Sequence, residues 1–103
     1  MTLPGLDPLI HAPVRLQICA ILSATDEAEF ALVREETGVS ESVLSKQVKL
    51  LEEAGYVAVR KATLASRQRT WLALTRAGRT AFAAHMQALT RLAQTAANAI
   101  AAE

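Results

Sequence analysis

Two helical patterns joined by a single glycine constrain the fold of this 103-residue chain most strongly. Residues 30–37 place apolar and polar side chains at helical spacing, and Gly38 follows them as a stop and a turn. Ser40 is a good N-cap for a second helix over residues 41–53, which Gly55 ends. The sequence therefore predicts two short consecutive helices with a tight turn between them.

The segments before and after this pair complete the layout. Pro13 opens an apolar helix through about Ser23, which is expected to lie centrally. Alternating, β-branched and aromatic residues predict strands over residues 56–61 and 69–74, with a basic loop over residues 62–68. Thr75 is a plausible N-cap for a long final helix. A further short helical turn is predicted at Asp7-Pro8.

This order of elements is typical of a winged helix-turn-helix. The predicted fold class is mainly α with a small β-hairpin wing (α+β) and a long C-terminal dimerisation helix. The length suits a single domain, with a winged-helix body over about residues 6–75 and the final helix over residues 76–101.

The helix over residues 41–53 separates its residues cleanly on a wheel drawn at about 100° per residue. Its apolar face holds Val43, Leu44, Val48, Leu50, Leu51 and Ala54. Its polar face holds Ser42, Ser45, Lys46 and Lys49. Lysines can neutralise phosphates or reach guanine edges, and short hydroxyls permit close approach to a groove floor. A solvated surface helix would show the same pattern, so this helix alone leaves both interpretations open.

Three further residues limit how such a helix could meet DNA. Glu52 and Glu53 share the polar face but lie at its C-terminal end, where phosphates would repel them if the helix lay flat. Only the N-terminal half, Ser42 to Lys49, is therefore expected to enter the groove. Gln47 falls inside the apolar arc and is a boundary residue with a weak claim to DNA contact.

The distribution of charge favours DNA. Residues 26–59 contain eight acidic and three basic residues, whereas residues 60–79 contain six basic residues and no acidic one. The bases around the predicted hairpin tip are Arg60, Lys61, Arg67 and Arg69. A hairpin carrying them could reach backbone phosphate or a minor groove, although a solvated charged loop is the alternative.

The final helix carries a heptad seam. Its residues are spaced 4, 3, 4, 3 and 4 apart: Phe82, Met86, Leu89, Ala93, Ala96 and Ile100. A domain this small has little left to cover so long a helix, so the seam predicts a homodimer interface. Folding of the helix back onto its own core is the alternative.

Three stretches carry a resemblance to a known family: "LDPLIHAPVRLQICAIL", "FALVREETGVSESVLSKQVKLLEEAGYV" and "RTWLALTRAGR". Over roughly residues 6–92 the chain resembles the small winged-helix transcriptional regulators related to the MarR and ArsR groups. The resemblance implies a short strand near Glu29-Phe30 and a homodimer. It also implies wing contacts at Lys61, Arg67 and Arg69, besides the groove contacts of the polar helix face. The Cys-x-Cys ligand pair of metal-sensing ArsR members is missing, and the chain is shorter than a typical MarR chain.

Four other residues could suggest chemistry. Cys19, the only cysteine, sits in the most apolar helix and is expected to be an inert buried thiol. His11 and His85 are distant in sequence and lack companion ligands; His11 is expected to cap or pack near Pro13, and His85 to lie on the flank of the last helix. Trp71 could stack on a base or ligand, but is expected to cover the wing or an interface. No catalytic constellation is visible, so neither an enzyme, nor a metal site, nor a cofactor is predicted.

The sequence thus predicts a sequence-specific DNA-binding transcriptional regulator, acting as a homodimeric repressor on a palindromic operator. The alternative is a winged-helix module that binds another protein and not DNA. The chain has no apolar run of transmembrane length and no signal-peptide pattern, and its single cysteine suits a reducing compartment, so a cytoplasmic protein without membrane contact is expected. No effector ligand can be inferred.

Overall fold

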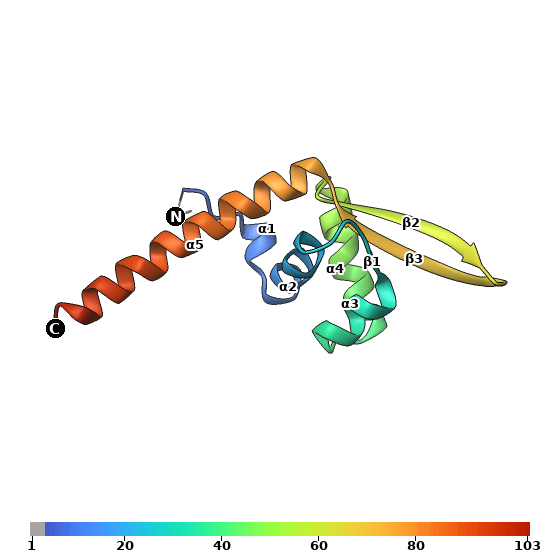
Figure 1. Cartoon of the computed structure of the whole chain (residues 1–103), viewed down its shortest axis with the longest axis horizontal. Helices are drawn as coiled ribbons and strands as arrows, with labels where there is room; N and C mark the ends of the chain where they lie inside the picture. The colour runs from blue at the N-terminus through green and yellow to red at the C-terminus, as the bar shows by residue number, and fades with distance from the viewer. Residues whose placement is uncertain (1–3) are drawn as a thin grey trace.

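The structure is a computed structural model that describes residues 4–103. Its elements follow in the order α1 (Pro8–His11), α2 (Pro13–Ser23), β1 (Ala28–Glu29), α3 (Phe30–Thr37), α4 (Glu41–Glu53), β2 (Val57–Leu64), β3 (Arg67–Leu74) and α5 (Arg76–Ala101). The strands form one antiparallel sheet in the order β1-β3-β2. This mainly helical fold with a small wing sheet and a long last helix confirms the predicted fold class (Figure 1).

Local capping explains where the helices begin and end. The side chains of Asp7, Ser40 and Thr75 accept hydrogen bonds from backbone N–H groups in the first turns of α1, α4 and α5, at 2.9, 3.2 and 3.0 Å. Gly38 follows α3 with a φ of 73°, a left-handed conformation that costs glycine nothing. The predicted helix boundaries, the caps and the short helical turn at Asp7-Pro8 are therefore confirmed.

Helix α2 lies between α1, α3, α4 and the sheet, which makes it central as predicted (Figure 1). The core that surrounds it is aliphatic: Ile10, Ile18, Cys19, Leu22, Ala28, Val33, Leu44, Val48, Leu51, Val57, Leu72 and Leu74 are all buried. From α4 the core takes one stripe at helical spacing, which confirms the apolar arc of the wheel. Val43 and Ala54, which also belong to that arc, are instead exposed.

The wing is longer and tighter than the sequence indicated. The two predicted strands, over residues 56–61 and 69–74, are confirmed, but the predicted loop over residues 62–68 is wrong, because β2 runs on to Leu64 and β3 already begins at Arg67. Only Ala65 and Ser66 form the turn, with φ values of 52° and 65°. Small residues can adopt this conformation at some cost, and a two-residue turn matches the twist of paired strands. The third strand, β1, lies one residue earlier than the resemblance implied.

Helix α5 leaves the body of the molecule after its first turns (Figure 1). Gly78 lies so close to the end of α4 that a Cβ atom built on it would stand 2.1 Å from the carbonyl oxygen of Tyr56. Gly78, His85 and Ala88 are buried against the body, whereas every residue from position 91 onward is exposed. The molecule is consequently elongated, measuring 61 × 25 × 23 Å.

Candidate nucleic-acid interface

The polar face of α4 is open to solvent. Ser42, Ser45, Lys46 and Lys49 are all exposed, while the opposite stripe of the helix is buried in the core. Ser42 lies 3.3 Å from the capping Ser40 through their hydroxyl oxygens. Within residues 4–103 neither Lys46 nor Lys49 takes part in an ion pair. Both ammonium groups are therefore available to an anionic partner.

A groove of about 350 Å³ separates α4 from the wing. Ser45 and Lys49 line it from the helix, and Lys61 lines it from β2. Glu41 and Glu52 also reach this groove, one from each end of α4. The structure thus brings three of the seven predicted contact residues to one concave surface, whose two lysines form no ion pair with its two carboxylates within residues 4–103.

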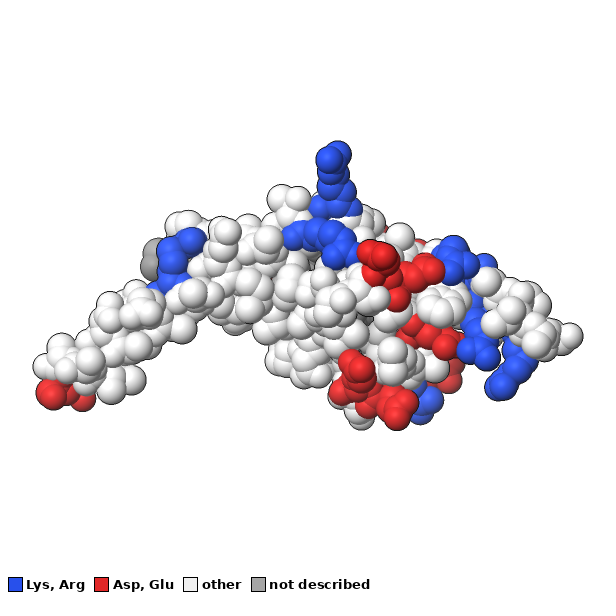
Figure 2. Space-filling model, in the orientation of Figure 1, with Lys and Arg blue, Asp and Glu red and all other residues white. Residues whose placement is uncertain are grey.

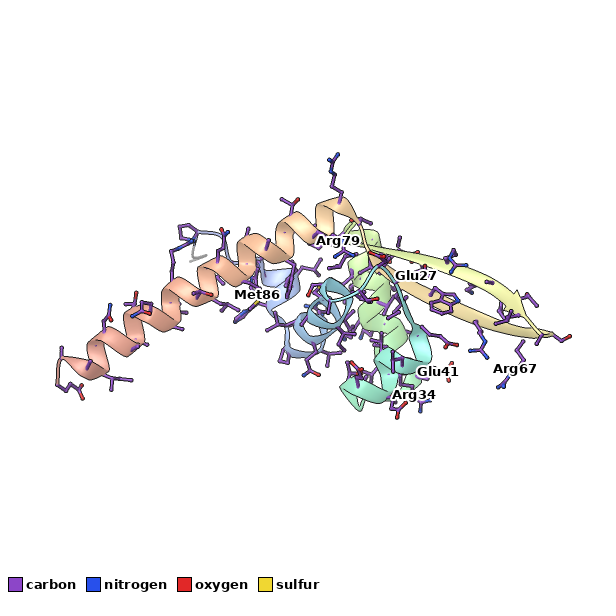
Figure 3. All side chains as sticks on the ribbon, in the orientation of Figure 1. Glu27, Arg34, Glu41, Arg67, Arg79 and Met86 are labelled. Atoms are coloured by element: carbon purple, nitrogen blue, oxygen red, sulfur yellow. The ribbon has the colours of Figure 1, made fainter. Side chains whose placement is uncertain are left out.

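The other predicted wing residues lie on the opposite face of the hairpin. Directly paired residues of antiparallel strands point to the same side, and the register pairs Leu64 with Arg67 and Ala62 with Arg69. Lys61 alternates with these positions along β2 and so points the other way. Figure 3 shows Arg67 far out on the wing, near enough to the tip to reach beyond the body of the protein.

Two arginines on this outer wing face are held by glutamates of the β1 region. Arg69 Nη1 lies 3.0 and 3.2 Å from the carboxylate oxygens of Glu29. Arg60 pairs in the same way with Glu27, and its guanidinium carbon lies 5.6 Å from the ring centroid of Trp71. The Arg60 hydrogen bond holds the pKa of Glu27 below its usual value. The sequence gives these arginines as free positive charge, whereas in the structure each is paired with a carboxylate.

Gln47 makes a structural contact instead of facing a groove. Arg15 Nη1 donates to Gln47 Oε1 over 2.6 Å, and Arg15 Nε donates to the carbonyl oxygen of Leu9 over 2.6 Å. One guanidinium therefore ties α4 to α1 and α2. The boundary position of Gln47 on the wheel is consistent with this contact, but the partner, 32 residues away, could not be read from the pattern.

The seam of α5 is only partly covered by the rest of the chain. Phe82 packs against the core and Leu89 is half-buried. Met86 is 40% exposed and Ile100 is 71% exposed, and the seam alanines Ala93 and Ala96 between them are exposed as well. In Figure 2 the outer half of α5 is mostly free of charged side chains. Folding back onto the core thus accounts for the start of the helix and not for its second half.

One of the two histidines differs from the sequence expectation. His85 does not lie on the flank of α5 but is fully buried, and its Nε2 lies 3.2 Å from Nδ1 of His11. Burial lowers the pKa of His85 below its usual value. Cys19 is buried as predicted, and burial raises the pKa of its thiol to about 11. Trp71 lies half-buried on the outer wing face under Arg60.

The part of the chain that the structure describes contains no group of three metal-ligating side chains. None of the helices formed by residues 4–103 has the length and apolar character that crossing a bilayer requires.

Comparison with known proteins agrees with this geometry. Residues 14–93 match the family described as the winged helix DNA-binding domain. An uncharacterized protein of Methanocaldococcus jannaschii, MJ0432, is 28% identical over 86 residues, which cover 84% of this chain and 94% of that protein. A transcriptional regulator homologue from Pyrococcus horikoshii OT3 has the same fold, with a TM-score of 0.79, 24% identity and coverage of 84% and 86% of the two chains.

HlyU from Vibrio cholerae is also similar in fold, with a TM-score of 0.63, 24% identity and coverage of 82% and 83%. The family match spans the helix-turn-helix, the wing and most of α5, which are the elements that form the surface described above. The chain therefore belongs to the winged helix DNA-binding domain family.

Proposed function

We propose that this protein is a sequence-specific transcriptional regulator that inserts the N-terminal half of α4 into the DNA major groove. The observation that carries this proposal is the exposed face of Ser42, Ser45, Lys46 and Lys49, which has no ion-pair partner within residues 4–103. Short hydroxyls and unpaired ammonium groups suit base edges and phosphates respectively. Lys61 and Arg67 of the wing would add backbone or minor-groove contacts.

The protein is proposed to act as a homodimer. Residues 6–75 form the DNA-binding body, and α5 supplies the partner surface through Met86, Leu89, Ala93, Ala96 and Ile100, with Phe82 at the border to the core. A second copy would cover the exposed apolar positions and place two α4 helices about 34 Å apart. Such a dimer reads a palindromic operator, and bound across a promoter it represses by occlusion.

DNA binding is tested by titrating random-sequence duplex at several salt concentrations. The wild-type protein should bind, and the logarithm of its association constant should fall linearly with the logarithm of salt. Replacing both Lys46 and Lys49 by alanine should flatten this slope by about 0.9 unit for each lost phosphate contact. Arg91→Gln removes one charge from α5 and should change the slope less. Absence of binding at low salt would refute the proposal and favour a protein-binding module.

The dimer is tested separately by light scattering at micromolar concentration. The wild-type protein should have the mass of two chains. The double substitution M86E/A93E puts charge on exposed seam positions and should give a folded monomer, since neither side chain belongs to the core. Q87E places one such charge on an exposed position away from the seam and should remain dimeric. A wild-type monomer would contradict the heptad assignment.

A further inference from the structure

A partly buried polar cluster connects three parts of the chain that the DNA-binding surface does not include. The backbone N–H of Asp7 donates to Nδ1 of His85 over 3.0 Å. The Asp7 carboxylate accepts the hydroxyl hydrogen of Tyr56 over 2.6 Å through Oδ2 and caps α1 through Oδ1. Asp7 thereby joins α5, which carries His85, to the segment directly after α4, which carries Tyr56.

Tyr56 is well placed to transmit a change from this cluster to α4. It follows Gly55 at the end of α4 and precedes β2. Its carbonyl oxygen accepts the N–H of Thr75 over 3.0 Å, and the first turn of α5 presses against the same carbonyl at Gly78. A rearrangement at the Tyr56 hydroxyl therefore acts where α4, the wing and α5 meet.

The hydrogen bonds define the protonation state of His85. Because Nδ1 accepts the Asp7 N–H, it must carry a lone pair, so the neutral ring holds its proton on Nε2 and donates it towards His11 Nδ1. A second proton on His85 would lie on Nδ1. The new N–H would then face the backbone N–H of Asp7, and the hydrogen bond between them would be lost. The Asp7 carboxylate could accept a hydrogen bond from this N–H only by giving up its hydrogen bonds to the Tyr56 hydroxyl and the Leu9 N–H.

The charged and titratable groups around the cluster come from every packed element. His11 of α1 faces His85, Cys19 of α2 lies near Asp7 and near Arg15, and Tyr56 binds the Asp7 carboxylate. Burial of the ring, followed by the proximity of His11, lowers the pKa of His85, while Asp7 opposes the shift. The hydrogen bond to Asp7 raises the pKa of Tyr56, which therefore remains a donor.

We propose that Asp7, Tyr56 and His85 form a proton-sensitive joint that positions α4 relative to α5, and that protonation of His85 loosens the joint and weakens DNA binding. The DNA half of this inference rests on the proposed function. The three residues are positioning residues, since the cluster lies away from the exposed face of α4, and its side-chain hydrogen bonds join the three residues to one another, to the α1 backbone and to His11.

The first test compares DNA affinity at pH 7.5 and at a pH below the titration midpoint of His85, which nuclear magnetic resonance gives. The wild-type protein should lose at least about five-fold more affinity than His85→Asn, because the asparagine Oδ1 replaces Nδ1 as an acceptor and does not titrate. His11→Gln is the matched control: it removes the other, exposed histidine and should keep most of the pH effect. An unchanged pH profile in His85→Asn would overturn the proposal.

The second test uses nuclear magnetic resonance on the wild-type protein and needs no DNA. Ring nitrogen shifts give the titration midpoint of His85, and the backbone amides of Gly55 and Tyr56 should shift with the same midpoint. In Tyr56→Phe, His85 should still titrate, but the chemical shift of the Gly55 amide should no longer change with the same midpoint. If the amide shifts of Gly55 and Tyr56 in the wild type do not follow the His85 midpoint, the proposal is overturned. A coupled titration in a chain that binds no DNA would support the joint and refute only the proposed function.

The stability of the fold provides a third readout. Because the folded state holds the pKa of His85 below its unfolded value of about 6.5, the unfolded chain binds this proton more readily. The free energy of unfolding should therefore be highest above about pH 6.5 and fall as the pH decreases towards the folded pKa. His85→Asn should remove this part of the acid destabilisation. If the free energy of unfolding of His85→Asn fell equally steeply with pH, His85 would not be the group responsible.

Discussion

The two faces of the wing carry similar basic side chains in different electrostatic situations. On the face towards α4, Lys61 opens into the groove and has no ion pair within residues 4–103. On the opposite face, Arg60 and Arg69 are bound to Glu27 and Glu29, and only Arg67 near the tip has no ion pair within residues 4–103. The difference shows that a run of basic residues in a sequence does not measure the charge available to a polyanion. Which cations are free depends on the acids that the fold brings beside them.

The largest effect should come from the face towards α4. The double substitution K49A/K61A removes both lysines of the groove and should lower DNA affinity by about 10- to 100-fold, with a salt slope flatter by about two units. The double substitution R60A/R69A removes two charges from the other face and should change the slope by less than one unit, since those charges are already neutralised. Equal effects from the two pairs would eliminate the distinction between the faces.

The second prediction releases one restrained arginine. Glu29→Gln removes the carboxylate that holds Arg69 and should raise DNA affinity by about two- to five-fold, with a steeper salt slope, if Arg69 then reaches phosphate. Glu35→Gln removes the same charge from an exposed position of α3 and corrects for the change in net charge. An affinity equal to that of this control would show that Arg69 has only a structural role.

The third prediction stabilises the turn of the wing without changing the charge of the wing. Ala65 and Ser66 both have positive φ values, which Asn-Gly adopts more readily in a two-residue hairpin turn. The double substitution A65N/S66G should therefore raise the free energy of unfolding by about 1 kcal/mol. Urea denaturation would measure it. A loss of stability would mean that the turn has a different conformation in solution, and the assignment of residues to the two faces would then need revision.

The smallest effect should come from the exposed ion pair. Glu27→Gln breaks its pair with Arg60, but a solvent-exposed pair contributes little to stability, so the melting temperature should stay within experimental error. Arg60 would keep its contact with Trp71, which limits its reach towards DNA. A large gain in DNA affinity would show instead that Glu27 is what restrains Arg60.

Local features of the fold could be predicted because short-range chemistry decides them. Asp7, Ser40 and Thr75 are caps wherever a helix follows them, and Gly38 ends α3 because few other residues adopt its φ value at no cost. The buried stripe of α4 followed from helical periodicity alone. The strand ends did not, because Ala62 to Leu64 lack a strong strand pattern and gain their conformation by pairing with β3.

The candidate contact surface could be predicted only in part. The polar face of α4 is a property of one helix, so the wheel identified it. The position of Arg69 depends on Glu29, 40 residues away, and that of Gln47 depends on Arg15. Nothing in the local pattern around either residue indicates these partners.

The sequence by itself determined the helix-turn-helix, the existence of the wing and the seam of α5, because caps, periodicity and composition act within a few residues. Only the tertiary structure decided which wing cations are free and that His85 is buried beside Asp7 and His11. The physical reason is that the charge and protonation of a side chain depend on its desolvation and on its neighbours in space. Those neighbours here come from segments 33 to 78 residues apart in the chain.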